Sequence, residues 1–547
     1  MSDPQFDVVI VGSGVGGLTA AITAKLAGLK PLLAEKTPLI GGSSALSGGV
    51  LWLPNNVLMQ REGIADSRED GLRYLGNFVP ENPIWSTEKR REAYVDSIGP
   101  MIAMLEEQGM RYQRCHGYSD YYDTLPGGNA AGRSIECPLF NSNRLGTWKA
   151  KFRPPSIAVP ICSSESARFF RLGFTMEGKL FAAKVAGRLV WSKLTGRTMY
   201  NAGASLQGRM LEVALRLGID IWTDAGLVDL DRQDGKVIGA QLNHEGRPVT
   251  VRASRGVIVT AGGFAHNLDM RERYQPKPTS DKWTVSNPGD TGEAIEAMAR
   301  AGAGLALMDQ SWWTPVFFPP DNRPQQQIIP ELQKPHGIMV DANGERFVNE
   351  ANSYMELGRA MYERNKTAQA VPAWAVFDRT ARKRHFFGFQ PPGGFPKKWK
   401  TSGVVKMDDT IAGLARQCGI DPDGLQRTIE RFNGFARAGV DEDYGRGNSA
   451  YNRYYADPTN KPNASLGPLE KPPFWAAQLW PGDVGTSGGA MTNEHGQVIR
   501  EDGTPIDGLY AAGNCTASLA GPYYVGAGQS IGTSSVFGYL AVKHAGK

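Results

Sequence analysis

The stretch DVVIVGSGVGG (residues 7–17) lies near the start of a chain of 547 residues. Its first half is a short apolar run with β-branched residues, which predicts a buried parallel strand. The glycines that follow allow a tight turn, and the pattern LTAAITAKLAG after them predicts a helix that ends at Gly28. A strand, a glycine-rich turn and a helix in this order predict the first unit of a Rossmann-like α/β fold.

A second strand is expected at residues 31–35, and it ends in Glu35, 23 residues after Gly12. At this spacing an acidic residue accepts hydrogen bonds from ribose hydroxyls, while a pyrophosphate lies against the helix N-terminus. A glycine-rich turn by itself could also belong to a structural strand–helix unit. Because strand, turn, helix and acid follow one another in order, we interpret the segment as a dinucleotide site. The expected cofactor contacts in it are Gly12, Ser13, Gly14, Gly16, Gly17, Glu35 and Lys36.

A loop of small residues follows at 39–49, and such a loop can lie close to a flat ring system. Two later segments, 256–263 and 508–513, repeat the pattern of a strand followed by glycines. A domain that binds only NAD does not need the last of these segments. Three cofactor-facing segments spread along the chain therefore predict a discontinuous FAD-binding domain with a second domain inserted into it. The residues expected near FAD in these segments are Gly42, Ser43, Ser44, Ser47, Gly48, Gly49, Ala261, Gly262, Gly263, Gly513 and Asn514.

The composition argues against several classes of protein. A hydrophobic fraction of 41% and a charged fraction of 21% are ordinary for a globular protein, and the length predicts two or three domains. The net charge of +5 is small, and no block of like charges indicates nucleic acid binding. The five cysteines have no CxxC spacing and the seven histidines have no ligand spacing. We therefore expect a reducing compartment, no disulfide framework and no metal site.

The expected location is the cytoplasm. The N-terminus leads directly into the first strand, which leaves no room for a secretory signal. No stretch approaches the roughly 20 apolar residues that a membrane-spanning helix needs.

Further motifs lie outside the dinucleotide fingerprint. They are GGSSALSGGVLWLP (41–54), DYYDTLPGG (120–128), WWTP (312–315), IMVDANGERFVNE (338–350) followed by Tyr354, GTSGG (485–489) and GPYYVGAGQSIG (521–532). With these motifs the chain resembles the fumarate reductase/3-ketosteroid dehydrogenase family of FAD enzymes over nearly its full length. It is most similar to the branch that desaturates 3-ketosteroids between carbon 1 and carbon 2. The segment from about 140 to 200 matches poorly and is expected to be an insertion.

The resemblance implies a division of the chain into two domains. The FAD-binding domain would comprise residues 1–308 and 483–547, and an α+β substrate or catalytic domain would comprise residues 309–482, with the active site in the cleft between them. No histidine follows Gly42, where covalent flavin attachment would need one, so the FAD is expected to be non-covalent. The resemblance adds three expected cofactor contacts, Val228, Ser530 and Ile531.

The resemblance also implies the catalytic residues. Tyr524 and the backbone N–H of Gly528 would hold the ketone oxygen, and a glycine at 528 would leave room for substrate and flavin to approach each other. Tyr354 would be the base, although a free phenol has a pKa near ~10 and needs help to act at neutral pH. Tyr121 would give that help by relaying the proton or by lowering the pKa, and its neighbour Tyr122 stays an alternative. For each of these tyrosines the competing interpretation is an aromatic core.

Several functional alternatives stay open. The implied substrate is a 3-ketosteroid, and the electron acceptor is unidentified, with a quinone as the candidate. A 3-ketosteroid 4-dehydrogenase could use the same motifs with the base in another position. A fumarate-reductase-like enzyme is disfavoured because no histidine accompanies residues 486–489, and a non-catalytic electron-transfer flavoprotein subunit would make the tyrosines incidental. Arg346, Asn349 and Glu350 are expected to tie a loop together through charge-assisted hydrogen bonds rather than to act as acid and base.

Residues 165–197 carry seven Lys or Arg residues and two acids, mixed with aromatic and aliphatic side chains. On a helix, Phe181, Val185 and Leu189 share one face, and such a segment could rest on a membrane surface and admit a lipophilic steroid. Lys193 interrupts that face. A basic helix packed on the FAD domain is the simpler alternative, so peripheral membrane contact is an expectation that competes with ordinary packing.

Overall fold

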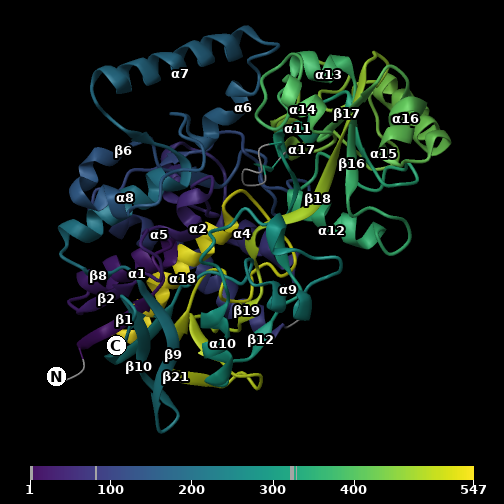
Figure 1. Cartoon of the computed structure of the whole chain (residues 1–547). Coiled ribbons are helices and arrows are strands. Elements are labelled where there is room, and N and C mark those ends of the chain that lie inside the picture. Colours follow the sequence, from purple (N-terminus) through teal and green to yellow (C-terminus); the bar gives the residue numbers. More distant parts are fainter. Residues whose placement is uncertain (1–3, 81–82, 321–325, 328) are drawn as a thin grey trace.

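The computed structural model describes residues 4–80, 83–320, 326–327 and 329–547. Figure 1 shows two main bodies of secondary structure, with both chain ends in the lower one and the strands and helices between about 330 and 480 in the upper right. Each body is built on its own large sheet. The mixed α/β fold expected from the sequence is confirmed.

The first sheet brings together the three strands that end in glycine-rich turns. Its order is β20-β21-β11-β1-β2-β8, and β11 pairs in parallel with β1 on one side and with β21 on the other. The carboxyl ends of three strands that are far apart in sequence therefore meet at one edge, where such sheets bind ligands. The strands are β1 (Gln5–Val11), β2 (Pro31–Ala34), β8 (Asp220–Trp222), β9 (Ala225–Gln233), β10 (Lys236–His244), β11 (Arg247–Val259), β20 (Gln497–Ile499) and β21 (Pro505–Ala511).

Two helices lie side by side on this sheet. They are α1 (Val15–Leu26), which follows β1, and α18 (Gln529–Ala545), which ends the chain (Figure 1). Close approach needs glycine, because a Cβ at Gly538 would lie 2.4 Å from the carbonyl oxygen of Gly16. The hydroxyls of Thr19 and Ser535 share a hydrogen bond of 2.8 Å across the contact. The start and the end of the chain thus form one packed unit.

The second sheet is antiparallel and has the order β14-β13-β18-β16-β15, with β17 beside β18. All seven residues of β13 are buried, which fits its aromatic and apolar sequence SWWTPVF. The helix α12 (Tyr354–Arg364) packs against β13, where a Cβ at Gly358 would lie 2.5 Å from Trp313 Cβ. The strands are β13 (Ser311–Phe317), β14 (Gln326–Gln327), β15 (Gly337–Val340), β16 (Ala373–Phe377), β17 (Val405–Asp408) and β18 (Phe474–Thr486). On these strands we base our proposal that residues 309–482 form the second domain.

A fully buried ion pair lies where the two bodies meet. Arg271 of α9 (Leu268–Tyr274) donates to Asp483 of β18 at 2.7 Å, and both side chains have 0% exposure. Thr284 bridges to Asp483 through the backbone as well.

A smaller sheet of β3 (Val50–Trp52), β4 (Gln113–Arg114) and β5 (Ser134–Glu136) lies nearby. The remaining elements of the two bodies are α2 (Gly42–Leu46), α3 (Val57–Arg61), α4 (Arg68–Gly76), η1 (Ile84–Ser86), α5 (Glu88–Glu107), α8 (Ala202–Arg216), η4 (Asp281–Trp283), α10 (Glu293–Arg300), β12 (Leu305–Ala306), α11 (Ile329–Leu332), α13 (Arg379–Arg384), α14 (Lys397–Thr401), α15 (Ile411–Cys418), α16 (Pro422–Ala438), α17 (Ala450–Tyr454) and β19 (Gly489–Ala490).

The segment from 140 to 200 forms an excursion that is closed at its base. Its first and last strands, β6 (Phe140–Asn141) and β7 (Met199–Tyr200), pair with each other. Between them lie η2 (Ser142–Lys151), η3 (Ser163–Glu165), α6 (Ser166–Phe169) and α7 (Met176–Leu194). Figure 1 shows α7 along the upper outer edge of the molecule, above α6. In the part of the chain that the structure describes, no helix is both long enough and apolar enough to cross a bilayer.

Candidate active site

The turn between β1 and α1 is shaped by contacts that exclude side chains. Gly12 has a φ of +99°, and a Cβ there would lie 2.4 Å from the carbonyl oxygen of Thr260 at the end of β11. A Cβ at Gly17 would lie 1.9 Å from the carbonyl oxygen of Gly12. The first turn of α1 is therefore drawn tightly onto the sheet, and its N-terminus offers backbone N–H groups to an anion.

Glu35 stands beside this turn, as the dinucleotide interpretation requires. Both the backbone N–H and the hydroxyl of Ser13 donate to Glu35 Oε2, at 3.1 and 2.5 Å. The N–H of Thr37 donates to Oε1 at 2.9 Å. The carboxylate is buried with its direction fixed, so it is oriented to accept a ribose hydroxyl.

The loop of small residues covers the turn from the other side. Ser44 Oγ accepts a hydrogen bond from the N–H of Val15 at 3.1 Å, and Ser43 Oγ donates to Asp290 Oδ2 at 2.7 Å. Gly49 has no room for a side chain, because its Cβ would lie 2.2 Å from the backbone of Ala202 at the start of α8. The expected contacts at Gly42, Ser47 and Gly48 belong to the same loop.

Most of the other expected cofactor residues lie near the glycine-rich turn, and Val228 does not. Ala261, Gly262 and Gly263 follow β11, and Gly513 and Asn514 follow β21, so both stretches lie at the edge where β1 ends. Lys36 donates to Thr291 at 2.5 Å and pairs with Glu293 at 2.8 Å. Val228 stands apart, because its side chain is 54% exposed on β9 and its carbonyl oxygen accepts a bond from Arg300. Its assignment to the cofactor stays a prediction.

Two residues beside the cradle were missed by the sequence analysis. Asp290 accepts from Ser43, and burial raises its pKa to about 7. Arg153, from the excursion, donates to Thr37 Oγ1 at 3.4 Å. Burial lowers the pKa of its guanidinium, and the nearby carboxylates of Glu35 and Asp290 act in the opposite direction. Asp290 sits between two glycines in the sequence, which was a usable signal, whereas nothing in the sequence linked Arg153 to this site. Together with the glycine turns, this mixed set of donors and acceptors fits the ribose and pyrophosphate of a dinucleotide.

Three tyrosines from distant parts of the chain are in contact. Tyr121 follows the loop 115–120, Tyr354 is the first residue of α12, and Tyr524 precedes α18. Their ring centroids are 5.6 Å apart for Tyr121 and Tyr354, 5.3 Å for Tyr354 and Tyr524, and 5.8 Å for Tyr121 and Tyr524. The structure therefore brings together the three side chains that were singled out from the sequence.

The Tyr354 phenol is a weak acid in this environment. Burial, followed by the neighbouring Tyr524 and Tyr451, raises its pKa well above the usual range. The hydrogen bond with Tyr121 acts in the expected direction and lowers this pKa, but burial outweighs it. Burial also raises the pKa of Tyr121 well above its usual range. The phenols of Tyr121 and Tyr354 are therefore uncharged at neutral pH.

Tyr524 and Gly528 occupy one loop and the helix that follows it. The Tyr524 hydroxyl shares a 3.2 Å hydrogen bond with Ser530 Oγ, and its ring meets Trp312 edge-on with centroids 5.0 Å apart. Trp312 in turn donates to Asn514 Oδ1 at 2.9 Å. Ser530, which was expected to contact the cofactor, thus orients the phenol.

Gly528 is the N-cap of α18, and its N–H has no acceptor among the residues that the structure describes. This free N–H lies at the positive end of the helix dipole, which suits an oxygen that gains negative charge. The expected reason for glycine here was room for substrate and flavin. The structure gives a different reason, because φ is +89° and a Cβ would lie 2.0 Å from the carbonyl oxygen of Val50 on β3.

A buried network supports the loop that carries Tyr121. The N–H of Tyr121 donates to the carbonyl oxygen of Val525 at 3.0 Å, which ties this loop to the Tyr524 loop. The neighbouring Asp120 accepts from Trp52 Nε1 and from Arg133 Nη1, both at 2.7 Å. Burial raises the pKa of Asp120 to about 6, although Arg133 acts to lower it.

The structure also separates Tyr121 from Tyr122. The Tyr122 ring lies against Phe78 and Tyr523, with ring centroids 5.1 and 6.1 Å apart, at the border between the core of the first body and the aromatic cluster. Tyr451, which the sequence analysis missed, lies 4.3 Å from Tyr121, and Tyr118 shares a hydrogen bond of 3.5 Å with the Tyr121 hydroxyl. These two lack a motif of their own, so only the tertiary fold identifies them.

The expected tie around Arg346 is confirmed. Arg346 binds Glu350 at 2.9 Å and Asp441 at 2.9 Å, and Arg446 binds the same Glu350 at 3.0 Å. All four side chains are buried, so the charges are paired within the second body rather than presented to a ligand. Among the described residues, no group of three or more His, Cys, Asp or Glu side chains is placed to hold a metal ion.

Comparison with known proteins identifies the family. The model of a family described as "FAD binding domain" matches residues 7–531. The 3-oxosteroid 1-dehydrogenase of Mycobacterium tuberculosis is 41% identical over 100% of this chain and 99% of its own length. The 4-oxocyclohexanecarboxylate 2-dehydrogenase of Sinomonas cyclohexanicum is 32% identical over 98% of this chain and 92% of its own length. The chain belongs to the FAD binding domain family, in the branch that contains the 3-oxosteroid 1-dehydrogenases.

A solved structure shows the same fold. The 3-ketosteroid delta1-dehydrogenase of Sterolibacterium denitrificans, in complex with 1,4-androstadiene-3,17-dione, is 35% identical and superposes with a TM-score of 0.93. The alignment covers 99% of this chain and 99% of that one. The expected discontinuous FAD-binding fold with an inserted α+β unit agrees with this similarity.

Gly17→Ala tests the cofactor cradle. The new Cβ would meet the Gly12 carbonyl oxygen, so the turn must open and the protein should be purified with little or no FAD. Flavin absorbance relative to protein absorbance measures the loss. Gly434→Ala in α16 is the matched control, since its Cβ would meet no atom within 4 Å, and it should retain FAD. Full flavin content in Gly17→Ala would contradict the assignment.

Proposed function

We propose that this flavoprotein desaturates 3-ketosteroids between carbon 1 and carbon 2. The observation that carries the proposal is the contact of Tyr121, Tyr354 and Tyr524 beside the free N–H of Gly528. The 3-oxosteroid 1-dehydrogenase and 3-ketosteroid delta1-dehydrogenase names of the relatives support the substrate class. These names favour carbon 1 over the 4-dehydrogenase alternative, and a catalytic enzyme over a subunit that only transfers electrons.

The reaction removes a proton from carbon 2 and a hydride from carbon 1. The ketone acidifies carbon 2, because the electrons left behind move onto the carbonyl oxygen. Tyr524 and the Gly528 N–H donate to this oxygen and stabilise its developing charge. Tyr354 in its phenolate form accepts the proton and becomes a neutral phenol, and the Tyr121 hydroxyl hydrogen-bonds to the phenolate before the transfer and so favours it. FAD, bound without a covalent link, supplies the acceptor for the hydride.

The uncharged state of the tyrosine cluster suits an apolar substrate. Trp312, Tyr451 and the three tyrosines lie in one cluster of buried apolar and aromatic side chains. A flat hydrocarbon ring system can displace such contacts without desolvating a charge. The 4-oxocyclohexanecarboxylate 2-dehydrogenase relative desaturates, by its name, next to a ring ketone as well, which supports the ketone as the shared feature.

Anaerobic mixing with androst-4-ene-3,17-dione tests the function. The flavin absorbance should bleach in a single turnover, and the product should be the 1,4-diene. Flavin that stays oxidised would contradict the proposal. In a second assay with a 3-ketosteroid that has a saturated A ring, a product with its new double bond between carbon 4 and carbon 5 would contradict it as well.

Tyr354→Phe tests the proposed base. The variant should retain FAD, and the rate of flavin reduction should fall by about 10²- to 10⁴-fold, since proton transfer by a side chain contributes about this much. In the unchanged protein this rate should rise with pH above neutrality, because the raised pKa of Tyr354 keeps the base form scarce at pH 7. Tyr121→Phe removes the hydrogen bond that lowers this pKa, so its profile should lie at still higher pH.

Tyr122→Phe is the control for this series. Its ring pairs with those of Phe78 and Tyr523 and with none of the three catalytic rings, so flavin reduction should stay close to the original rate and pH profile. Undiminished flavin reduction in Tyr354→Phe would remove this residue as the base.

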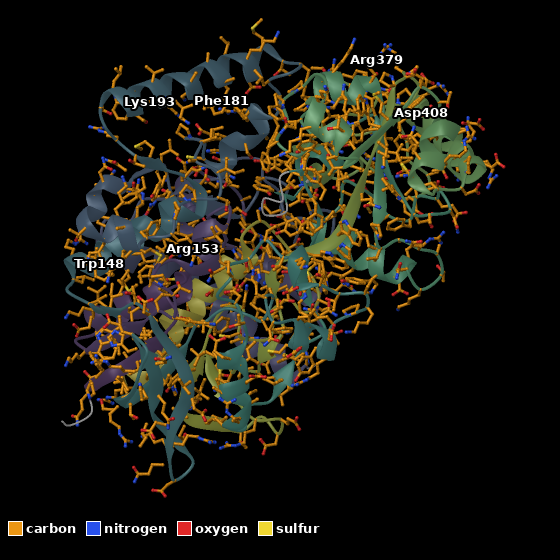
Figure 2. All side chains as sticks on the ribbon, in the orientation of Figure 1. Trp148, Arg153, Phe181, Lys193, Arg379 and Asp408 are labelled. Carbon is orange, nitrogen blue, oxygen red and sulfur yellow. The ribbon has the colours of Figure 1, made fainter. Side chains whose placement is uncertain are left out.

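We further propose that α7 rests on a membrane surface, which would bring the enzyme close to lipophilic steroids and to a quinone as electron acceptor. The face expected to meet lipid was wrong, because Phe181 and Val185 are buried. Figure 2 labels Phe181 and Lys193 on this helix. The opposite face supports the proposal. Its four largest aliphatic side chains are more than half exposed and fall on one side of the helix, namely Met176, Leu180, Val190 and Leu194.

Basic residues border this exposed apolar face. Lys179 and Lys184 are both exposed and lie on either side of it, and Lys193 lies outside it. An apolar stripe between lysines is the pattern of a helix that binds an anionic membrane surface in its plane. On the buried side, Arg188 pairs with Glu165 at 2.7 Å, which fastens α7 to the body.

Replacement of Leu180, Val190 and Leu194 together by Gln tests the membrane contact. Loss of buried apolar area should lower the fraction recovered with phosphatidylglycerol vesicles several-fold in flotation. Val440→Gln is the control, because Val440 is 52% exposed and lies after α16, away from α7. Equal recovery of the triple variant and the unchanged protein would contradict the contact.

A further inference from the structure

A cavity lies outside the proposed active site, on the outer side of the first body. Its volume is about 200 Å³, and it opens between the end of α5, the helix η2 and the second half of α8. Trp148 of η2 is labelled in Figure 2 at the left edge of the molecule. The residues that line the cavity are Gln108, Gly109, Arg111, Arg144, Arg209, Glu212, Val213 and Arg216.

The lining carries an unbalanced positive charge. Four guanidinium groups face one carboxylate, and Arg144 pairs with that carboxylate, Glu212, at 2.7 Å. Three positive charges are left without an acidic partner among the described lining residues. Like charges gathered around one small cavity repel one another, and an anion in the cavity would relieve this repulsion.

The remaining guanidinium groups are held in place by neutral partners. Arg209 donates to the carbonyl oxygen of Leu139 at 2.9 Å, and Arg216 donates to that of Gln108 at 2.6 Å. The Nε of Arg209 is buried and has no acceptor among the described residues. Arg111 is exposed and makes no hydrogen bond or ion pair with the described part of the chain. The exposed Arg111 guanidinium thus keeps its donors available for a ligand.

One aromatic ring orients the arginines further. The guanidinium carbons of Arg144 and Arg209 lie 5.9 and 5.5 Å from the centroid of the Phe140 ring. Burial lowers the pKa of Arg209, and the charges of Arg144 and Arg111 act in the same direction. Stacked guanidinium groups with fixed N–H directions are suited to bidentate binding of phosphate oxygens.

We propose that this cavity binds the phosphate group of an anionic ligand. Its volume is below the roughly 300 to 1,000 Å³ of pockets that enclose a drug-sized molecule, so it fits a phosphate or pyrophosphate group rather than a whole nucleotide or steroid. Such a group can belong to a soluble phosphate compound or to a lipid headgroup.

The cavity lies close to α7, the helix that we propose to contact the membrane, and this position supports a lipid headgroup as the ligand. The helix η2, which carries Arg144, also fastens the turn after α7, because Asn143 donates to the Gly196 carbonyl oxygen at 2.8 Å. Lys149 donates to Thr198 Oγ1 at 2.8 Å in the same contact. The cavity and the exposed helix α7 are thus joined by one short segment.

Titration of the FAD-loaded enzyme with inorganic pyrophosphate tests the proposal, with FAD already in its own phosphate site. Isothermal titration calorimetry at low ionic strength should show saturable binding with one site per chain. Arg111→Gln should weaken it several-fold without disturbing the fold, since Arg111 has no partner to lose. Arg111→Gln combined with Arg216→Gln should weaken it at least tenfold. The control Arg255→Gln, an exposed arginine on β11, should bind as the unchanged protein does.

Flotation with vesicles of phosphatidylcholine and phosphatidic acid separates the two sources. Lower recovery of the double variant, with unchanged flavin content, would assign the cavity to a lipid headgroup. Unchanged recovery together with lost pyrophosphate binding would assign it to a soluble phosphate compound. Absence of saturable pyrophosphate binding, or equal binding by the double variant and the unchanged protein, would overturn the proposal.

Discussion

The contact between β3 and Gly528, the residue directly before α18, fixes the position of the proposed active-site groups. At Gly528 the two backbones approach so closely that a Cβ would lie 2.0 Å from the Val50 carbonyl oxygen, and Gly528 accepts a hydrogen bond from the Trp52 N–H at 3.1 Å. This contact sets where the free N–H of Gly528 points. Trp52 also holds Asp120, next to Tyr121, so one short strand positions groups from two loops.

The cofactor cradle and the tyrosine cluster are connected through the same elements. Asn514, which follows β21, accepts from Trp312, and Trp312 packs on Tyr524. The Rossmann-like sheet thus carries the proposed FAD contacts at one edge, and Asn514 at that edge connects it through Trp312 of β13 to the aromatic cluster. The fully buried pair of Arg271 and Asp483 joins the two bodies nearby, at a place where removal of one partner would leave a buried charge.

The sequence predicts this architecture where the signal is local. The turn at 12–17, Glu35 and the glycines after β11 and β21 need particular backbone shapes, so their residue types can be recognised without a structure. The prediction of the tyrosine cluster depended on a resemblance to known enzymes, because no local sequence pattern links Tyr121 to Tyr354. Only the tertiary fold shows that Arg153 lies beside the cofactor cradle. The lipid-facing side of α7 was misassigned because both sides carry apolar residues, and only packing decides which side is buried.

We propose that the proton and the hydride leave the ring from opposite faces, with the proton taken from carbon 2 by the tyrosine cluster and the hydride taken from carbon 1 by FAD. The most direct test uses 3-ketosteroids that carry deuterium in a single known configuration at carbon 1 or at carbon 2, with mass spectrometry of the product. The account predicts that one hydrogen is lost from each of these carbons and that the two lost hydrogens lie on opposite faces. Loss of both hydrogens from the same face, or retention of deuterium at both positions in both configurations, would contradict it.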